Sequence, residues 1–216
     1  MPTPQEPPAD ALLTAASLAC RRGERLLIQG LDVALRPGEI TWLRGSNGRG
    51  KTTLLRVLAG LSSPDAGTLS WQGRAWKASR DDAARGTAYL AHANALKEDL
   101  TAQESLAFLA RLHGQHAAPD AIVAALKGFS IASRRDAPVR TLSQGQRRRV
   151  ALARLLLAPA KPLWLLDEPY DALDVDGCAR LDEVLAAHVR GGGSVLLTSH
   201  LPLSLRDPSP RELVLQ

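Results

Sequence analysis

A glycine-rich segment in the first quarter of the chain contains the residue types needed to bind phosphate groups. Residues 45–52 read Gly-Ser-Asn-Gly-Arg-Gly-Lys-Thr, which fits the phosphate-loop pattern G-x-x-x-x-G-K-[ST]. The glycines leave backbone N–H groups free to face phosphate oxygens, and the N-terminus of a following helix adds its positive dipole end. Lys51 supplies a cation for the β- and γ-phosphates, and the Thr52 hydroxyl can bind Mg²⁺.

The phosphate loop stands between a predicted strand at residues 39–44 and a predicted helix at residues 51–61. This context disfavours the alternative that the glycines only form a turn before an ordinary helix. We therefore predict a nucleoside triphosphate site built from Gly45, Ser46, Asn47, Gly48, Arg49, Gly50, Lys51, Thr52 and Thr53.

Two carboxylates follow an apolar stretch later in the chain. Residues 163–166 read Leu-Trp-Leu-Leu, and Asp167 and Glu168 come directly after them. A strand of a parallel sheet delivers such residues to the edge where ligands bind. Asp167 would then hold Mg²⁺, and Glu168 would polarise the attacking water. Taken alone, this pattern is as often structural as functional, so the assignment depends on the phosphate loop upstream.

A third motif, Leu142-Ser-Gln-Gly-Gln146, fits a capping box with Ser143 at the N-cap and Gln146 three residues later. A hydroxyl and free N–H groups at a helix N-terminus also form an anion site. From these residues alone both readings stay open. The run Arg147–Arg149 that follows is interpreted as a charged helix face rather than a patch for nucleic acid.

The elements that position these motifs alternate between strands and helices, which predicts an α/β fold with a mostly parallel sheet. Two or three strands are expected in residues 12–35, and an antiparallel hairpin in residues 67–76. Further strands are expected at residues 87–91, 163–167 and 194–199, and further helices at 101–113, 119–129, 143–158 and 175–189. The predicted organisation is a loose tail (1–10) and a single domain (11–216), in which a helical lobe (95–158) is inserted into a core (11–94 and 159–216).

Composition narrows the class of protein. The 216 residues include 27 Lys+Arg and 22 Asp+Glu, and 45% are hydrophobic, which supports a buried core and argues against intrinsic disorder. The two cysteines form no disulfide framework or metal motif. No apolar run reaches the ~18–20 residues of a membrane span, and the first ten residues lack the pattern of a secretory signal. Only 4% of residues are aromatic, so base stacking and nucleic-acid binding are not expected.

Five motifs in a fixed order make the chain similar to the ATP-binding subunits of ABC transporters. They are the phosphate loop, Leu-Ser-Gln-Gly-Gln, Leu-Trp-Leu-Leu-Asp-Glu-Pro, Asp-Ala-Leu-Asp (residues 171–174) and Thr-Ser-His (residues 198–200). The resemblance spans about residues 12–203. It implies the P-loop NTPase fold of ABC ATPases, hydrolysis of ATP to ADP and phosphate, and ATP and Mg²⁺ as cofactors.

The resemblance also implies roles for individual residues. Ser143 and Gly145 match the signature motif, which caps the γ-phosphate of ATP bound to the second subunit of a dimer. Asp174 matches the loop that crosses the dimer interface. His200 matches the histidine that contacts the γ-phosphate and the attacking water. The implied catalytic residues are Glu168, His200 and Lys51, and the implied metal ligands are Thr52 and Asp167.

Three positions depart from the family pattern. The aromatic residue that stacks on adenine, about 23 positions before the phosphate loop, is replaced by Arg22, whose guanidinium stacks more weakly. The glutamine that ends the strand before the helical lobe is replaced by His92, whose neutral imidazole can hydrogen-bond as an amide does. Gln144 stands where the signature motif usually has glycine.

The run from His92 to Leu106, the Leu-Ser-Gln-Gly-Gln motif and the short length resemble the haem-exporter ATP-binding subunit of bacterial cytochrome c maturation. That resemblance implies an ATP-dependent homodimer at the cytoplasmic face of the inner membrane, held there by integral membrane subunits. ATP hydrolysis would be coupled to haem export or to release of a haem-loaded chaperone. No residue is expected to ligate haem. The main alternative is an ABC ATPase for a different cargo. An ABC protein acting on DNA or ribosomes is disfavoured by the short length, and a degenerate cassette that only binds ATP is disfavoured by the intact Lys51, Asp167, Glu168 and His200.

Overall fold

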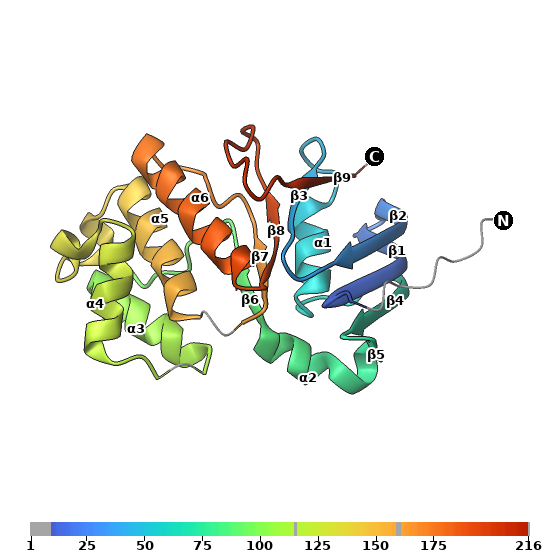
Figure 1. Cartoon of the computed structure of the whole chain (residues 1–216), viewed down its shortest axis with the longest axis horizontal. Coiled ribbons are helices and arrows are strands. Elements are labelled where there is room, and N and C mark those ends of the chain that lie inside the picture. Colours follow the sequence, from blue (N-terminus) through green and yellow to red (C-terminus); the bar gives the residue numbers. More distant parts are fainter. Residues whose placement is uncertain (1–9, 115, 159–160, 216) are drawn as a thin grey trace.

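Two β-sheets and a group of helices make up the part of the chain that the computed structural model describes, residues 10–114, 116–158 and 161–215. Figure 1 shows a parallel sheet in the middle, with α3–α6 on one side and α1 and the second sheet on the other. Apart from Asp10, the tail predicted for residues 1–10 lies outside the described residues.

The second sheet is antiparallel and has the strand order β2-β1-β4-β5. Its strands are β1 (Leu13–Arg22), β2 (Arg25–Leu35), β4 (Ala66–Trp71) and β5 (Arg74–Ala75). β1 and β2 form a hairpin that turns at Gly23, where φ is +59°, and Arg22 pairs with Arg25 across it. The antiparallel part predicted from the short apolar runs is confirmed.

The central sheet has the order β6-β7-β8-β3-β9, and every pair in it is parallel. Its strands are β6 (Thr87–Leu90), β7 (Leu163–Leu166), β8 (Ser194–Thr198), β3 (Ile40–Arg44) and β9 (Arg211–Val214). Because the strands are parallel, the loops after β3, β7 and β8 leave the sheet at one edge. This edge therefore receives the phosphate loop, the Asp167–Glu168 pair and His200.

The predicted helices are confirmed, with shifted ends. The α-helices are α1 (Lys51–Leu58), α2 (Trp76–Gly86), α3 (Ala102–Leu112), α4 (Pro119–Gly128), α5 (Gln144–Ala153) and α6 (Val175–Arg190). Short 3₁₀ turns occur at η1 (Ala132–Arg134), η2 (Val139–Thr141) and η3 (Arg154–Leu157). The predicted helix 51–61 ends early, since Gly60 has φ of +72° and leaves the helical conformation. The predicted helix 143–158 tightens to a 3₁₀ turn at Arg154.

The two faces of the central sheet pack into two different hydrophobic clusters. On β7, Trp164 and Leu166 pack into the cluster formed with α3–α6, whereas Leu163 and Leu165 pack into the cluster formed with α1 and the antiparallel sheet. This alternation is what the two-residue period of a strand dictates. β7 and β8 are buried along their whole length, so the loops that follow them begin from fixed positions. None of the helices in the described part of the chain is long and apolar enough to cross a membrane.

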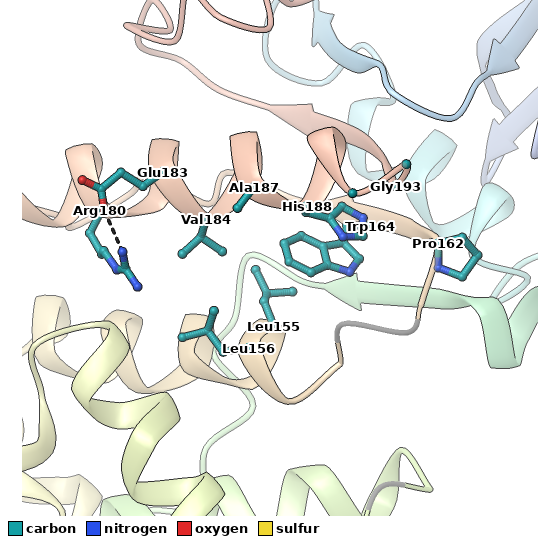
Figure 2. Close-up of a pocket in the computed structure, with 12 residues that line it drawn as sticks. Leu155, Leu156, Pro162, Trp164, Arg180, Glu183, Val184, Ala187, His188 and Gly193 are labelled. Atoms are coloured by element: carbon teal, nitrogen blue, oxygen red, sulfur yellow. Dashed lines mark hydrogen bonds and ion pairs between the residues drawn. The ribbon is translucent and has the colours of Figure 1, made fainter.

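One half-buried histidine lies at the opposite end of the sheet from the phosphate loop. The His188 ring on α6 stacks on Trp164 of β7, with ring centroids 3.7 Å apart and planes 7° from parallel (Figure 2). Gly193 makes room for the imidazole, because a Cβ at that position would come within 2.2 Å of it. Burial lowers the pKa of His188 to about 4, so the ring is neutral in the folded protein at pH 7.

We expect the free energy of unfolding to fall as the pH drops from about 6.5 to about 4. In this range the unfolded chain protonates His188 and the folded chain, with its pKa of about 4, does not. The loss at pH 5 is at most about 2 kcal/mol. Urea unfolding at about pH 7.5 and 5 measures the free energy of unfolding at each pH. Between these pH values it should fall less in His188→Gln than in the unsubstituted chain. In His116→Gln, at an exposed position, it should fall by the same amount as in the unsubstituted chain. An unchanged loss in His188→Gln would contradict this assignment.

Candidate nucleotide site

The phosphate loop joins the end of β3 to the start of α1 and depends on glycine at three positions. Gly45, Gly48 and Gly50 have φ values of +154°, +77° and +96°, which favour glycine. A Cβ at Gly50 would lie 3.1 Å from the Leu27 side chain, and one at Gly45 would lie 3.2 Å from the Leu215 carbonyl. No side chain in the described part of the chain caps the N-terminus of α1. Its first N–H groups therefore remain available to an anion.

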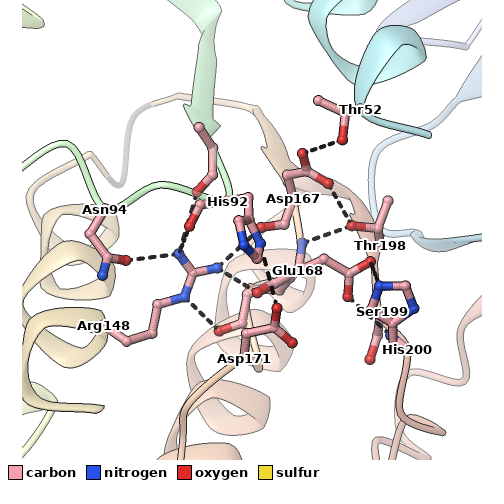
Figure 3. Close-up of polar contacts among 12 residues, drawn as sticks. Thr52, His92, Asn94, Arg148, Asp167, Glu168, Asp171, Thr198, Ser199 and His200 are labelled. Carbon is pink, nitrogen blue, oxygen red and sulfur yellow. Dashed lines mark hydrogen bonds and ion pairs between the residues drawn. The ribbon is translucent and has the colours of Figure 1, made fainter. Parts of the chain in front are cut away.

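Asp167 is the junction between this loop and the central sheet. Its buried carboxylate accepts hydrogen bonds from the Thr52 hydroxyl at the start of α1 (2.7 Å) and from the Thr198 hydroxyl at the end of β8 (2.9 Å), as Figure 3 shows. Nearby, the Lys51 ammonium donates to the Gly45 carbonyl at 2.7 Å. Lys51, Thr52 and Asp167 are thus brought together, as the sequence predicted.

Glu168 has a backbone conformation that is unusual for a residue with a side chain. Its φ is +48°, and its N–H donates to the Thr198 hydroxyl at 2.7 Å. Its carboxylate accepts a hydrogen bond from the His200 N–H at 3.0 Å, and the imidazole Nε2 lies 3.4 Å from the other carboxylate oxygen (Figure 3). The Glu168 side chain is 7% exposed and that of His200 is 50% exposed, so the pair has a buried end and an open end.

An open pocket of about 390 Å³ connects these groups. Its walls include most of the phosphate loop, Asp167, Glu168, His200 and Arg22. Arg25 and Leu27 also line it and were not predicted. The signal for Arg25 was present, because a two-residue turn places it directly across the hairpin from Arg22.

His92 lies at the mouth of the same pocket. Its side chain is 69% exposed, and its Nδ1 lies 3.4 Å from the Asp171 carboxylate in the loop after β7 (Figure 3). The residue that replaces the family's glutamine therefore contacts the loop that carries Glu168.

The remaining predicted residues, Ser143, Gly145 and Asp174, lie away from this pocket. The Ser143 hydroxyl accepts a hydrogen bond from the Gln146 N–H, and the Gln146 amide accepts from the Ser143 N–H, so the predicted capping box is present. Gly145 packs so closely on the Ala172 carbonyl that a Cβ would lie 2.7 Å from it. The carboxylate of Asp174 caps α6 and pairs with Arg149.

The interpretation of Arg147–Arg149 as a charged surface face was wrong for Arg148. This side chain is 2% exposed, and its guanidinium donates to carbonyl groups in the loop after β6 and in the loop after β7. Helical spacing contained the signal, since Arg148, Leu152 and Leu155 follow the i, i+4, i+7 pattern of a buried helix face.

The chemistry of the donors fits Mg²⁺ together with a triphosphate. Thr52 and Asp167 present hard oxygen atoms next to Lys51, which is the donor set that Mg²⁺ prefers. Among the described residues no three His, Cys, Asp or Glu side chains cluster in a way that could hold a metal ion by themselves. Metal binding here would therefore rely on phosphate oxygens and water in addition to the protein.

Comparison with known proteins agrees with this geometry. The ABC transporter family matches residues 28–171. The cytochrome c biogenesis ATP-binding export protein CcmA of Cupriavidus necator is 46% identical over 189 residues, which cover 88% of this chain and 83% of that protein. CcmA of Pseudomonas putida is 47% identical over 201 residues, which cover 93% and 95% of the two chains.

Solved structures show the same fold. An ATP-binding subunit of an ABC transporter superposes with a TM-score of 0.82 at 25% identity, over 95% of this chain and 86% of that one. A dimeric ATP-binding cassette bound to ADP and phosphate superposes with a TM-score of 0.79 at 21% identity, over 94% of each chain. The phosphate loop, the carboxylates after β7 and the family match lead to one conclusion. The chain belongs to the ABC transporter family and is an ATP-binding, ATP-hydrolysing transporter subunit.

Proposed function

We propose that this chain is the ATPase of a membrane complex for cytochrome c maturation, in which ATP hydrolysis drives haem export or the release of a haem-loaded chaperone. The proposal is supported by the names of the relatives, which are cytochrome c biogenesis ATP-binding export proteins and match most of the chain. We place the chain at the cytoplasmic face of the bacterial inner membrane, bound through integral membrane subunits, with residues 95–158 acting as its helical lobe.

The observation that supports hydrolysis best is the joint position of Lys51, Asp167 and Glu168 at one sheet edge. Lys51 would exchange its bond to the Gly45 carbonyl for the β- and γ-phosphates, which the backbone of the loop surrounds. Thr52 and Asp167 would hold Mg²⁺, which neutralises phosphate charge when bound. Glu168 would orient and polarise the attacking water, and His200 would contact the γ-phosphate beside it.

We also propose that the second copy of the chain completes each site. Ser143 and Gly145 stand at a helix N-terminus but line no part of the pocket of their own chain, so their phosphate contact requires a partner. Asp174 lies two residues after Ala172, whose carbonyl packs against Gly145. It would therefore reach the dimer interface next to the signature motif.

The cargo is tested in the host organism. Deleting the gene should abolish covalent haem attachment to c-type cytochromes, detected by haem staining of denaturing gels. Plasmid-borne unsubstituted chain should restore the stain and Lys51→Ala should not. Normal c-type cytochromes in the deletion strain would point to an ABC ATPase that serves a different cargo.

Lys51→Ala should weaken ATP binding at least about tenfold and abolish turnover, because the triphosphate loses its main protein cation. Fluorescent-nucleotide titration and phosphate release measure the two effects. Lys127→Ala, which removes an exposed lysine on α4, should change neither quantity. Full affinity and turnover in Lys51→Ala would refute the phosphate-loop assignment.

Arg22 and Arg25 should make the site weakly selective for the base. A guanidinium that stacks on a base contacts its face, and not the hydrogen-bonding edge that distinguishes adenine from guanine. We expect ATP and GTP affinities within about tenfold of each other, or ~1.4 kcal/mol. Competition titrations of both nucleotides on the unsubstituted chain measure this ratio. A preference for ATP of about a hundredfold would mean that another residue reads adenine.

Glu168→Gln should trap a dimer. The amide keeps the size of the side chain but no longer polarises water, so bound ATP persists and holds two chains together. Light scattering should find monomers without nucleotide and dimers with Mg·ATP, and adding Ser143→Arg should abolish the dimer. Glu183→Gln, an exposed position on α6, should behave as the unsubstituted chain. A Glu168→Gln protein that remains monomeric at saturating ATP would contradict the shared site.

A further inference from the structure

The guanidinium of Arg148 is buried between two loops that approach the nucleotide pocket from different strands. Arg148 lies on α5, five residues after Ser143, and is 2% exposed. Among the described residues it forms no salt bridge with a carboxylate, and all its hydrogen bonds go to carbonyl or amide oxygens. A buried charge that is satisfied in this way holds backbone in place rather than pairing with another side chain.

One set of these bonds goes to the loop after β7. Nη2 donates to the carbonyls of Asp167 (3.1 Å) and Glu168 (2.5 Å), and Nε donates to that of Pro169 (3.2 Å), as Figure 3 shows. Three successive carbonyls thus converge on one guanidinium. The middle one belongs to the residue whose φ is +48°, a conformation that L-residues rarely adopt without support.

The other set goes to the loop after β6. Nη1 donates to the carbonyls of Ala91 and His92 at 3.3 Å and to the side-chain oxygen of Asn94 at 3.0 Å. The same loop reaches the pocket through His92, which pairs with Asp171. Arg148 therefore fixes the backbone of both loops relative to the helix that begins at the signature motif.

We propose that Arg148 is the positioning residue that keeps Glu168 in its hydrolytic geometry, and that it does so by linking the loop after β7 to the loop after β6. The inference rests on the proposed role of Glu168. The side chain of Asp167 is held separately, by hydrogen bonds from the Thr52 and Thr198 hydroxyls, and Arg148 makes no hydrogen bond to the described residues of the phosphate loop. Loss of the guanidinium should therefore release Glu168 while ATP still binds.

Arginine is required for this task because its planar fork presents donors in several fixed directions. A lysine at this position has three donors on one nitrogen and cannot reach both loops at once. Arg148→Lys should consequently resemble Arg148→Gln in turnover, although it keeps the charge.

The chain offers a matched control in Arg154. This second arginine of the same helical segment is half-buried, and it donates to the Tyr89 carbonyl of β6. It makes no hydrogen bond to residues 167–169 among those described. Arg154→Gln thus removes a half-buried guanidinium and its hydrogen bond to a backbone carbonyl without changing a contact of the loop that carries Glu168.

The experiment compares Arg148→Gln, Arg148→Lys, Arg154→Gln and Glu168→Gln in the full chain. If the isolated chain hydrolyses ATP too slowly to measure, the variants are assayed within the membrane complex. ATP hydrolysis, nucleotide affinity and melting temperature are measured for each. We expect both Arg148 variants to lose about 100-fold in kcat, with Kd for ATP changed by less than about threefold. Arg154→Gln should lower the melting temperature but keep kcat within about threefold below that temperature.

Two further measurements separate positioning from folding. Added methylguanidinium at millimolar concentration should restore part of the turnover of Arg148→Ala, since it can occupy the vacated space, and should leave Arg154→Ala unchanged. If Arg148→Gln does not fold, Asn94→Ala removes one acceptor only and should lower kcat several-fold at constant Kd.

Equal loss of kcat in Arg148→Gln and Arg154→Gln, or a loss of ATP affinity in proportion to turnover, would overturn the positioning role. Normal turnover of Arg148→Gln beside an inactive Glu168→Gln would overturn this inference alone. Normal turnover of Glu168→Gln would overturn the proposed catalytic role of Glu168 and this inference with it.

Discussion

The carboxylate of Asp167 is the contact on which the geometry of the site depends. It is buried, and each of its oxygens accepts one hydroxyl hydrogen bond, from Thr52 on α1 and from Thr198 on β8. One side chain thus connects the helix after the phosphate loop with two strands of the central sheet. The Thr198 hydroxyl also accepts a hydrogen bond from the Glu168 N–H, so the backbone of Glu168 contacts the same network. A buried polar network of this kind is stable only when every member has its partner.

Much of the fold and of the site could be predicted from local patterns. The phosphate loop stood between a strand and a helix, and apolar runs marked β7 and β8, whose carboxyl ends meet at one edge in a parallel sheet. The capping box at Ser143 located the start of α5. These features are local or depend only on strand direction, and for this reason sequence reasoning reached them.

The elements that were missed depend on contacts between distant segments. α2 begins at Trp76 without a side-chain cap and has few apolar residues, so no start signal marks it. β9 is short and mostly exposed, and its pairing with β3 spans most of the chain. Arg148 looked like part of a basic surface because its acceptors are backbone carbonyls, which no residue type reveals. Sequence patterns report side-chain chemistry well and backbone acceptors hardly at all.

The uncapped start of α1 makes bound nucleotide a structural part of the helix. Among the described helices α3, α5 and α6 each begin with a side chain that accepts a backbone N–H, whereas α1, α2 and α4 have no such cap. Of these three, only α1 begins at the pocket, where its N-cap residue is Gly50. A phosphate bound at this point accepts hydrogen bonds from the first N–H groups of α1, as an N-cap side chain does in other helices. The folded state then gains free energy in proportion to the logarithm of nucleotide concentration above Kd. Without any nucleotide the folded state lacks this contribution, and local unfolding at the start of α1 then costs less free energy.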